Sequence, residues 1–421
     1  MSFLFFLFAC RNYGKGYIDT IQDENGIGDT AMLAEPESLP TSEPTAEPDS
    51  EPESQPTAEP DSEPSSEPSS SPTSEPESTD PTLYSWSEEG VSDGNGSLEI
   101  EIEIPANATS VMITSETDDY VFVDRFESPN GTAVYSWNDW GNSSEMLTLA
   151  MYPDHVNVLN WPVRSIDTEL SAGTWKLSLV TLRVMGSDFY YAGNTPVDLR
   201  IQYKTDTNLS QATVKARIVY ADGVQNNTEV VSAVAQAISY WEDVWSAANI
   251  TLIHSIQNEN VDATLPFPGD PIVSQLSANT AEDEILIVIG ETVENEENLL
   301  GISGGIPGSL VDTNKSVMMV SWLNNAGPDG VFDALEIEML GVTMVHEIGH
   351  YMGLFHPVEI ELTNWDALND TAYCTALPQC ENLLGTNLMF PYPVFQSNGS
   401  LGIKDITIDQ QAVLHRYTGS L

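Results

Sequence analysis

Hydrophobic and polar residues alternate along the middle of the chain. The clearest example is Leu98–Ile104, where Leu and Ile occupy every second position and Glu fills the positions between them. A period of two is typical of a strand with one buried face. Similar short runs at Tyr120–Val123 and Trp175–Val180 are separated by turn-forming residues such as those of Ser128–Gly131. Residues 83–208 are therefore predicted to form an all-β sandwich domain.

The pattern becomes mixed in the second half of the chain. Thr213–Tyr220 is a strand candidate, Val230–Val244 carries apolar residues at helical spacing, and Ile285–Ile289 is a continuous apolar run, typical of a buried strand. A long helix is predicted to begin near Asp333. Residues 209–421 are therefore predicted to form an α+β domain, which makes the protein multidomain.

The first ten residues are almost wholly apolar and end in Leu7-Phe8-Ala9-Cys10. Such a run before a small residue and a cysteine resembles a bacterial lipoprotein signal. The resemblance implies that residues 1–10 are the signal and that Cys10 becomes the lipidated first residue of the mature protein. The alternative is a truncated ordinary signal peptide. Both predict export, either as a cell-surface or outer-membrane lipoprotein or as a secreted protein.

Residues 11–82 are predicted to be a disordered stalk rich in Pro, Glu and Ser. Proline recurs at every fourth position from Pro36 to Pro76, and the stretch from Glu35 to Asp80 holds 14 acidic residues and no basic one. Proline at this density prevents helix and sheet, and the like charges repel one another. At roughly 3.1 Å per residue, an extended spacer of this kind reaches on the order of 100–150 Å.

Charge and cysteine content exclude several classes of protein. The 421 residues include 13 Lys and Arg against 64 Asp and Glu, a formal charge of −51, which argues against nucleic acid as a partner. Three cysteines are too few for a disulfide framework or a four-cysteine metal site. No apolar run has the roughly 18–20 residues of a membrane span, so membrane attachment is expected only through lipid at Cys10.

The predicted long helix carries the residues that can perform chemistry. His346 and His350 are four residues apart, so both rings project from one helix face toward a shared ion. Glu347 lies beside them, where its carboxylate can accept a proton from metal-bound water. Gly353 allows a positive φ that ends the helix and folds the chain back, which lets His356 supply a third nitrogen. Three neutral imidazoles and one water form the open arrangement of catalytic zinc.

The stretch His346–His356 resembles the metzincin zinc proteases. The order of residues that follows is most similar to that of the pappalysin group, and the matching residues are Asp366, Asp370-Thr371, Cys374, Cys380 and Asn387-Leu388-Met389-Phe390-Pro391. The resemblance implies that His346, His350 and His356 bind Zn²⁺ and that Glu347 is the general base. It also implies that Met389 is the Met-turn residue, an apolar floor beneath the metal. Residues 83–208 are weakly similar to β-sandwich domains that accompany secreted proteases.

Cysteine, tyrosine and glutamate residues near this motif add further expectations. Cys374 and Cys380 are predicted to form a disulfide, because export exposes them to oxidation and their pairing leaves only Cys10 over. Tyr392 stands one position later than the tyrosine that related enzymes often place after the Met-turn, so structural packing is the preferred interpretation. Glu359 either orients a zinc ligand or is a solvated loop carboxylate.

Calcium is a further expectation. Four aspartates lie in oxygen-rich loops near the predicted helix, namely Asp329, Asp333, Asp366 and Asp370. Clustered carboxylates suit Ca²⁺, and the resemblance to pappalysins implies that calcium is bound. The chain contains no twelve-residue calcium loop, and solvated acidic loops are the alternative in a chain this acidic.

The sequence thus predicts a monomeric, zinc-dependent endopeptidase that hydrolyses protein or peptide substrates outside the cell. The alternative is a surface binding or adhesion protein in which the metal domain is vestigial. Loss of a histidine ligand or of Glu347 would mark such decay, and all four residues are present.

Overall fold

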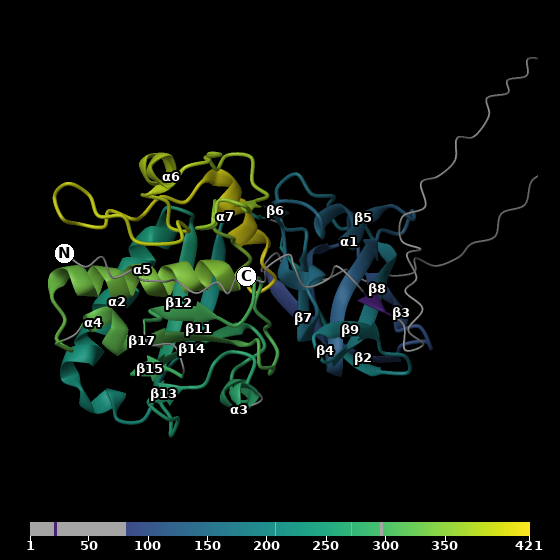
Figure 1. The fold of residues 1–421 in the computed structure, drawn as a ribbon, viewed down its shortest axis with the longest axis horizontal. Helices are drawn as coiled ribbons and strands as arrows, with labels where there is room; N and C mark the ends of the chain where they lie inside the picture. Colours follow the sequence, from purple (N-terminus) through teal and green to yellow (C-terminus); the bar gives the residue numbers. More distant parts are fainter. Residues whose placement is uncertain (1–20, 23–80, 207, 271, 295–297, 328) are drawn as a thin grey trace, which may run out of the picture.

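The computed structural model describes residues 21–22, 81–206, 208–270, 272–294, 298–327 and 329–421. A β-rich N-terminal unit lies beside a C-terminal unit in which helices pack on a sheet (Figure 1). The predicted signal and its Cys10, and nearly all of the predicted stalk, lie outside the described residues. None of the helices in the described part is both long enough and apolar enough to cross a membrane.

The N-terminal unit is built on one curled sheet of nine strands. These are β1 (Ile21–Gln22), β2 (Thr82–Val91), β3 (Ser97–Ile104), β4 (Ala108–Glu127), β5 (Ala133–Ser136), β7 (Asp154–Trp161), β8 (Gly173–Met185), β9 (Asp188–Tyr191) and β10 (Pro196–Thr205). Three short elements complete the unit, namely α1 (Trp137–Trp140), β6 (Glu145–Met146) and the 3-10 helix η1 (Leu149–Met151). Strand content agrees with the all-β expectation for this region.

A sandwich is expected to contain two separate sheets, but the strands of this unit form a single sheet. The first half of β4 pairs with β7 and β10, and its second half pairs with β5 and β8. The pairing with β7 shifts register between Glu116 and Val121, an irregularity of the kind that bends a strand. Because β4 is 20 residues long, it passes through both halves and keeps them hydrogen-bonded into one sheet.

A second difference concerns the predicted disordered segment. Ile21 and Gln22 fall within residues 11–82, yet they form β1 and pair in parallel with β9. The proline repeat that motivated the prediction begins only at Pro36, so its constraint on backbone conformation does not extend to these two residues.

The C-terminal unit contains a five-stranded sheet in the order β12-β11-β14-β17-β16. Its strands are β11 (Ala212–Tyr220), β12 (Ile250–Asn258), β14 (Glu284–Gly290), β16 (Gly301–Ser303) and β17 (Val317–Ser321). Its helices are η2 (Val224–Asn226), α2 (Thr228–Ser246), α3 (Val273–Ser277), α4 (Trp322–Ala326), α5 (Ala334–Tyr351), α6 (Leu377–Leu384) and α7 (Ile408–Arg416). The short strands β13 (Thr264–Leu265), β15 (Thr292–Val293) and β18 (Trp365–Asp366) lie outside the sheet. Only β16 runs antiparallel to its neighbour in this sheet.

Helices α2 and α5 pack against one another and against strands of this sheet (Figure 1). The continuous apolar run predicted to be a buried strand is β14, in which every residue from Ile285 to Gly290 is buried. The predicted long helix is α5, and Asp333 is its N-cap. The Asp333 carboxylate accepts hydrogen bonds from the backbone N–H groups of Leu335 and Glu336, which fixes where the helix starts.

The C-terminal tail lies between the two units (Figure 1). Thr418 is hydrogen-bonded to Ser110 at 3.0 Å and to Asn160 at 2.8 Å, both in the N-terminal unit. The buried Lys204 ammonium donates to the backbone oxygens of His415 (2.6 Å) and Ser420 (2.5 Å). These polar contacts, here called the seam, join strands β4, β7 and β10 to the C-terminal tail.

Candidate metal centre

Helix α5 and the turn after it bring three histidines together. His346 and His350 lie on the last turns of α5 and are 0% and 1% exposed. The chain then reverses at Gly353, whose φ of 105° favours glycine, and His356 returns to the helix at 2% exposure. All three side chains form a group whose candidate ligand atoms lie within 4.8 Å of one another.

The ring nitrogens that face inward are Nε2 atoms. The Nε2 of His356 is 3.2 Å from the Nε2 of His346 and 3.2 Å from the Nε2 of His350. The outward Nδ1 atoms of His346 and His350 lie 2.8 Å and 2.6 Å from the backbone oxygens of Leu388 and Leu354. A carbonyl oxygen only accepts, so each of these Nδ1 atoms carries the proton and each Nε2 keeps its lone pair.

The third histidine is oriented in the same way by a carboxylate. The Nδ1 of His356 lies 2.9 Å from Oε2 of Glu359, which directs the lone pair of its Nε2 inward as well. This contact decides between the two interpretations of Glu359 in favour of the orienting one. Burial holds the pKa of His346 and of His350 well below the usual value, so both rings are in the neutral form that binds metal.

Three lone pairs that point at one another in a dry site repel, and a cation among them removes the repulsion. Zn–N bonds of roughly 2.0–2.1 Å in tetrahedral geometry place ligand nitrogens about 3.3 Å apart. The two observed separations of 3.2 Å are close to that value. The group can therefore hold a metal ion, and three imidazoles suit Zn²⁺ among other transition metals.

Glu347 lies beside the histidines with one oxygen free. Its side chain is 1% exposed, and its Oε1 has no hydrogen-bond partner among the described residues. The backbone N–H of Ser303 in β16 donates to the carboxylate, and burial raises the pKa of Glu347 to about 8. A cation at the histidines would lower that pKa. Gly301 permits this close approach of β16, because a Cβ there would lie 2.9 Å from Cγ of Glu347.

Met389 lies beneath the helix between the first two histidines. It is fully buried, and a Cβ on Gly349 would lie 2.6 Å from its Sδ. Glycine at this position therefore lets the methionine approach the helix backbone. The neighbouring Leu388 supplies the carbonyl that fixes the His346 ring. Met389 thus packs against the helix segment that carries His346 and His350, and its assignment as a Met-turn residue stays a prediction.

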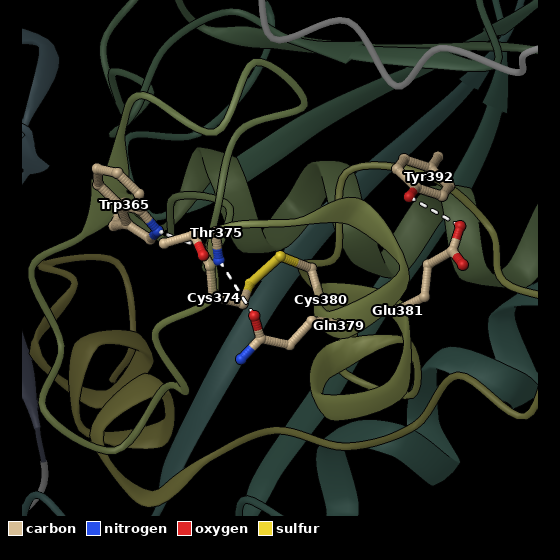
Figure 2. The surroundings of a disulfide bond; sticks show 7 residues. All are labelled: Trp365, Cys374, Thr375, Gln379, Cys380, Glu381 and Tyr392. Carbon is tan, nitrogen blue, oxygen red and sulfur yellow. Dashed lines mark hydrogen bonds between the residues drawn. A yellow bond between two sulfur atoms is a disulfide. The ribbon is translucent and has the colours of Figure 1, made fainter.

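Figure 2 shows the surroundings of the disulfide in the loop that follows the third histidine. The predicted disulfide between Cys374 and Cys380 is present. Nearby, the hydroxyl of Tyr392 donates to Oε1 of Glu381 in α6 at 3.0 Å. Tyr392 also packs edge to face with Phe390. These contacts agree with the packing role expected for Tyr392.

The four aspartates considered for calcium lie at two places. Asp333 caps α5, and Asp329 accepts from a backbone N–H in the loop before it. Asp366 lies in β18, and Asp370 accepts from the backbone N–H of Asp409 in α7. Burial raises the pKa of Asp366 to about 7. Among the described residues, the histidine group alone brings three or more potential metal ligands together.

Sequence reasoning missed one pair that supports the centre. The side-chain amides of Asn387 and Gln410 bond to each other in both directions at 2.9 Å and 3.1 Å, and both residues are buried. Oδ1 of Asn387 also accepts from the backbone N–H of Met389 at 2.9 Å. The pair thus ties α7 to the turn that carries the Leu388 carbonyl. No local pattern in the sequence signals the partner of Asn387.

Comparisons with known proteins add little to this geometry. No family model matches the sequence, and no curated protein matches it significantly. One similar solved structure is metalloproteinase-II from Bacteroides fragilis, with a TM-score of 0.29 and 11% identity over 51% of this chain and 61% of that chain. A second is from infectious bursal disease virus Gx strain, with a TM-score of 0.14 and 12% identity over 30% of this chain and 37% of that chain.

A third is a family two carbohydrate esterase from Cellvibrio japonicus, with a TM-score of 0.11 and 8% identity over 51% of this chain and 70% of that chain. This chain covers 61% of the length of the metalloproteinase. At these TM-scores and identities, the neighbours establish neither a shared fold nor a shared activity. The histidine group is therefore the firmest indication of function.

Proposed function

We propose that this protein is a zinc-dependent endopeptidase of the metzincin type, most similar to pappalysins, that hydrolyses extracellular proteins or peptides. One observation carries the proposal. Three oriented histidine lone pairs converge at 3.2 Å separations beside a buried carboxylate oxygen that has no partner in the described part of the chain. Three nitrogen ligands leave the fourth tetrahedral position open, as in catalytic zinc sites.

Each residue then has a defined task. Zn²⁺ would be held by His346, His350 and His356. When bound, the ion would polarise the carbonyl of the scissile peptide bond and lower the pKa of a water molecule. Oε1 of Glu347 accepts the proton of the attacking water and returns it to the leaving amine. Its buried position excludes bulk water, and the Ser303 N–H holds the carboxylate in place for both proton transfers.

The test is the substitution Glu347→Gln, which keeps the shape of the side chain and removes its basicity. We expect zinc to remain bound at one ion per chain while casein hydrolysis falls by roughly 10²–10⁴-fold. Metal content measured by atomic absorption and hydrolysis measured on the same preparation separate the two effects. Undiminished hydrolysis in this variant would contradict the role of Glu347.

The alternative, a surface adhesion protein, predicts binding without hydrolysis, and a protease assay distinguishes the two. Hydrolysis of casein or gelatin that a zinc chelator such as phenanthroline abolishes supports the peptidase. Glycan or cell binding without any hydrolysis supports the adhesin. Export, lipidation at Cys10 and a monomeric state belong to the same proposal, and mass measurement of the mature protein tests the first two.

A further inference from the structure

A short hairpin follows the third histidine and carries the carboxylate that orients it. Val358 and Trp365 form an antiparallel bridge, and the backbone N–H of Glu359 donates to Asn364 O at 3.0 Å. Glu359 in turn holds Nδ1 of His356 at 2.9 Å. His356 lies outside helix α5, so its ring position depends on this hairpin (Val358–Trp365). An isolated two-stranded hairpin is marginally stable in water, so the hairpin needs outside support.

The disulfide loop supplies part of that support, since Trp365 contacts Tyr373 and Cys374. The backbone of the hairpin is held from the other side by the N-terminal unit. Strand β6 pairs in parallel with β18, the end of the hairpin. The backbone N–H of Trp365 donates to Ser144 O at 2.9 Å, and that of Ala367 donates to Met146 O at 3.1 Å. The guanidinium of Arg164, also in the N-terminal unit, donates to Ala367 O at 3.2 Å. Strand β18 is thereby the middle strand of a small three-stranded arrangement, between the Val358 segment and β6.

The same segment of the N-terminal unit reaches the other flank of the metal centre. The backbone N–H of Leu149 donates to Ile306 O at 2.9 Å. Ile306 follows β16, whose Ser303 holds the Glu347 carboxylate. An ion pair at 2.7 Å between Asp154 and Lys315 fastens the two units nearby. Residues 144–149 therefore contact chain segments next to both His356 and Glu347.

We propose that the N-terminal unit is a working part of the metal centre, because residues 144–149 hold the hairpin that positions His356. Glu359 is the positioning residue through which this support acts. The inference rests on the proposed function only in taking the three histidines to bind metal. It follows that the N-terminal unit is not a detachable pro-segment, since its removal would take away the β6 pairing of the hairpin and weaken metal binding.

The first test weakens the contact between the hairpin and the N-terminal unit, with one substitution on each side of it. Ala367→Pro removes the N–H that donates to Met146, and Arg164→Ala removes the side chain that contacts Ala367 O. Loss of support around a ligand lowers metal affinity by roughly 10–100-fold, which we expect for Ala367→Pro, with a smaller loss for Arg164→Ala. Arg125→Ala is the matched control, because Arg125 pairs with Glu127 in the same unit.

Two readouts accompany each variant. Competition against a fluorescent chelator gives the Kd for Zn²⁺, and hydrogen exchange of residues 358–367 in the zinc-free protein reports the hairpin directly. We expect weaker zinc binding and faster exchange in Ala367→Pro, and neither change in Arg125→Ala. Unchanged zinc affinity together with fast hairpin exchange would overturn the proposal. Failure of the unmodified protein to bind zinc would instead reject the proposed function.

A second test does not depend on how these variants fold. A specific protease site placed at residues 208–210, between β10 and β11, allows the full chain to be cut after folding. We expect both fragments to remain associated with an unchanged Kd for Zn²⁺, and urea to release the N-terminal fragment and the zinc over the same range. Release of the N-terminal fragment at lower urea while zinc stays bound would overturn the proposal.

Discussion

The seam and the metal centre are two clusters of buried polar groups that differ in how their hydrogen-bonding groups are satisfied. In the seam, Lys204 is fully buried, yet its ammonium donates to two backbone oxygens, and Thr418 bonds to both Ser110 and Asn160. In the metal centre, the outward nitrogens of the histidines lie on oxygen acceptors and the inward nitrogens face one another, while Oε1 of Glu347 has no hydrogen-bond partner in the described part of the chain. A satisfied buried network holds structure together, whereas an unsatisfied one indicates a missing partner.

The difference separates stability from function. Replacing a group in the seam should cost folding free energy and leave metal binding intact. Replacing a group in the metal centre should weaken metal binding and leave the folding free energy nearly unchanged. Such a group contributes little to the stability of the native state without metal. Each of the following experiments challenges or refines that separation.

The largest effect is expected from His350→Leu. Zinc affinity should fall on the order of 1,000-fold, about 4 kcal/mol, which is roughly a third of the 10–16 kcal/mol with which Zn²⁺ binds zinc-finger peptides. The unfolding free energy of the zinc-free protein should change by less than about 1 kcal/mol, because burying an apolar side chain in place of a polar ring offsets the lost bond to the Leu354 oxygen. Chelator competition and urea unfolding in EDTA measure the two quantities. A large loss of zinc-free stability would break the comparison.

The seam should respond in the opposite way to Lys204→Met. Two buried carbonyl oxygens, of His415 and Ser420, would lose their donor, at about 1–3 kcal/mol each. We therefore expect a loss of about 3 kcal/mol in unfolding free energy with an unchanged Kd for Zn²⁺. The control is Lys176→Met, an exposed lysine paired with Glu99, which should leave stability unchanged. Weakened zinc binding in Lys204→Met would show that the seam and the centre are coupled.

The predictable parts of this structure depend on contacts between residues close in sequence. The helix period and the N-cap at Asp333 predict α5, and the spacing of His346, His350 and Gly353 predicts the turn that returns His356. Alternation in Leu98–Ile104 predicts β3 in the same way. These features follow from local backbone geometry, which a sequence expresses directly.

The parts that escaped prediction depend on contacts between distant residues. The bond between Asn387 and Gln410 joins residues 23 apart, and the contact of Ser144 with Trp365 joins the two units. The continuity of β4 through both halves of the sheet depends on its partners, not on its own pattern. Such contacts are decided by how elements pack, and a single sequence carries no periodic signal for them.

A smaller effect within each pH unit is expected from Asp366, which tests the calcium hypothesis. Its pKa of about 7 in the folded state exceeds the ordinary value of 3.8, so the folded protein binds more protons than the unfolded chain between these limits. Unfolding free energy should therefore fall as pH rises from about 4 to 7, by at most about 1.4 kcal/mol per pH unit.

The substitution Asp366→Asn should remove this slope, as measured by urea midpoints in EDTA at pH 4.5, 5.5 and 6.5. If Asp366 and Asp370 bind Ca²⁺, added calcium should flatten the slope in the unmodified protein, because a bound cation keeps the carboxylate ionised. An unaltered slope at millimolar calcium would count against a site at these residues.

The smallest effect is expected from Gln410→Leu. Gln410 shares features of both clusters. The amide pair with Asn387 is satisfied like the seam, yet it supports the turn whose Leu388 carbonyl orients His346. We expect about a tenfold loss of zinc affinity, the lower end for a partner behind a ligand, because the turn loses one of its anchors. Gln411→Leu is the matched control, since Gln411 contacts Ile406 and not the turn. Zinc affinity that falls equally in both variants would assign the effect to helix α7 as a whole, whereas a loss confined to Gln410→Leu shows that a satisfied network can also serve the metal.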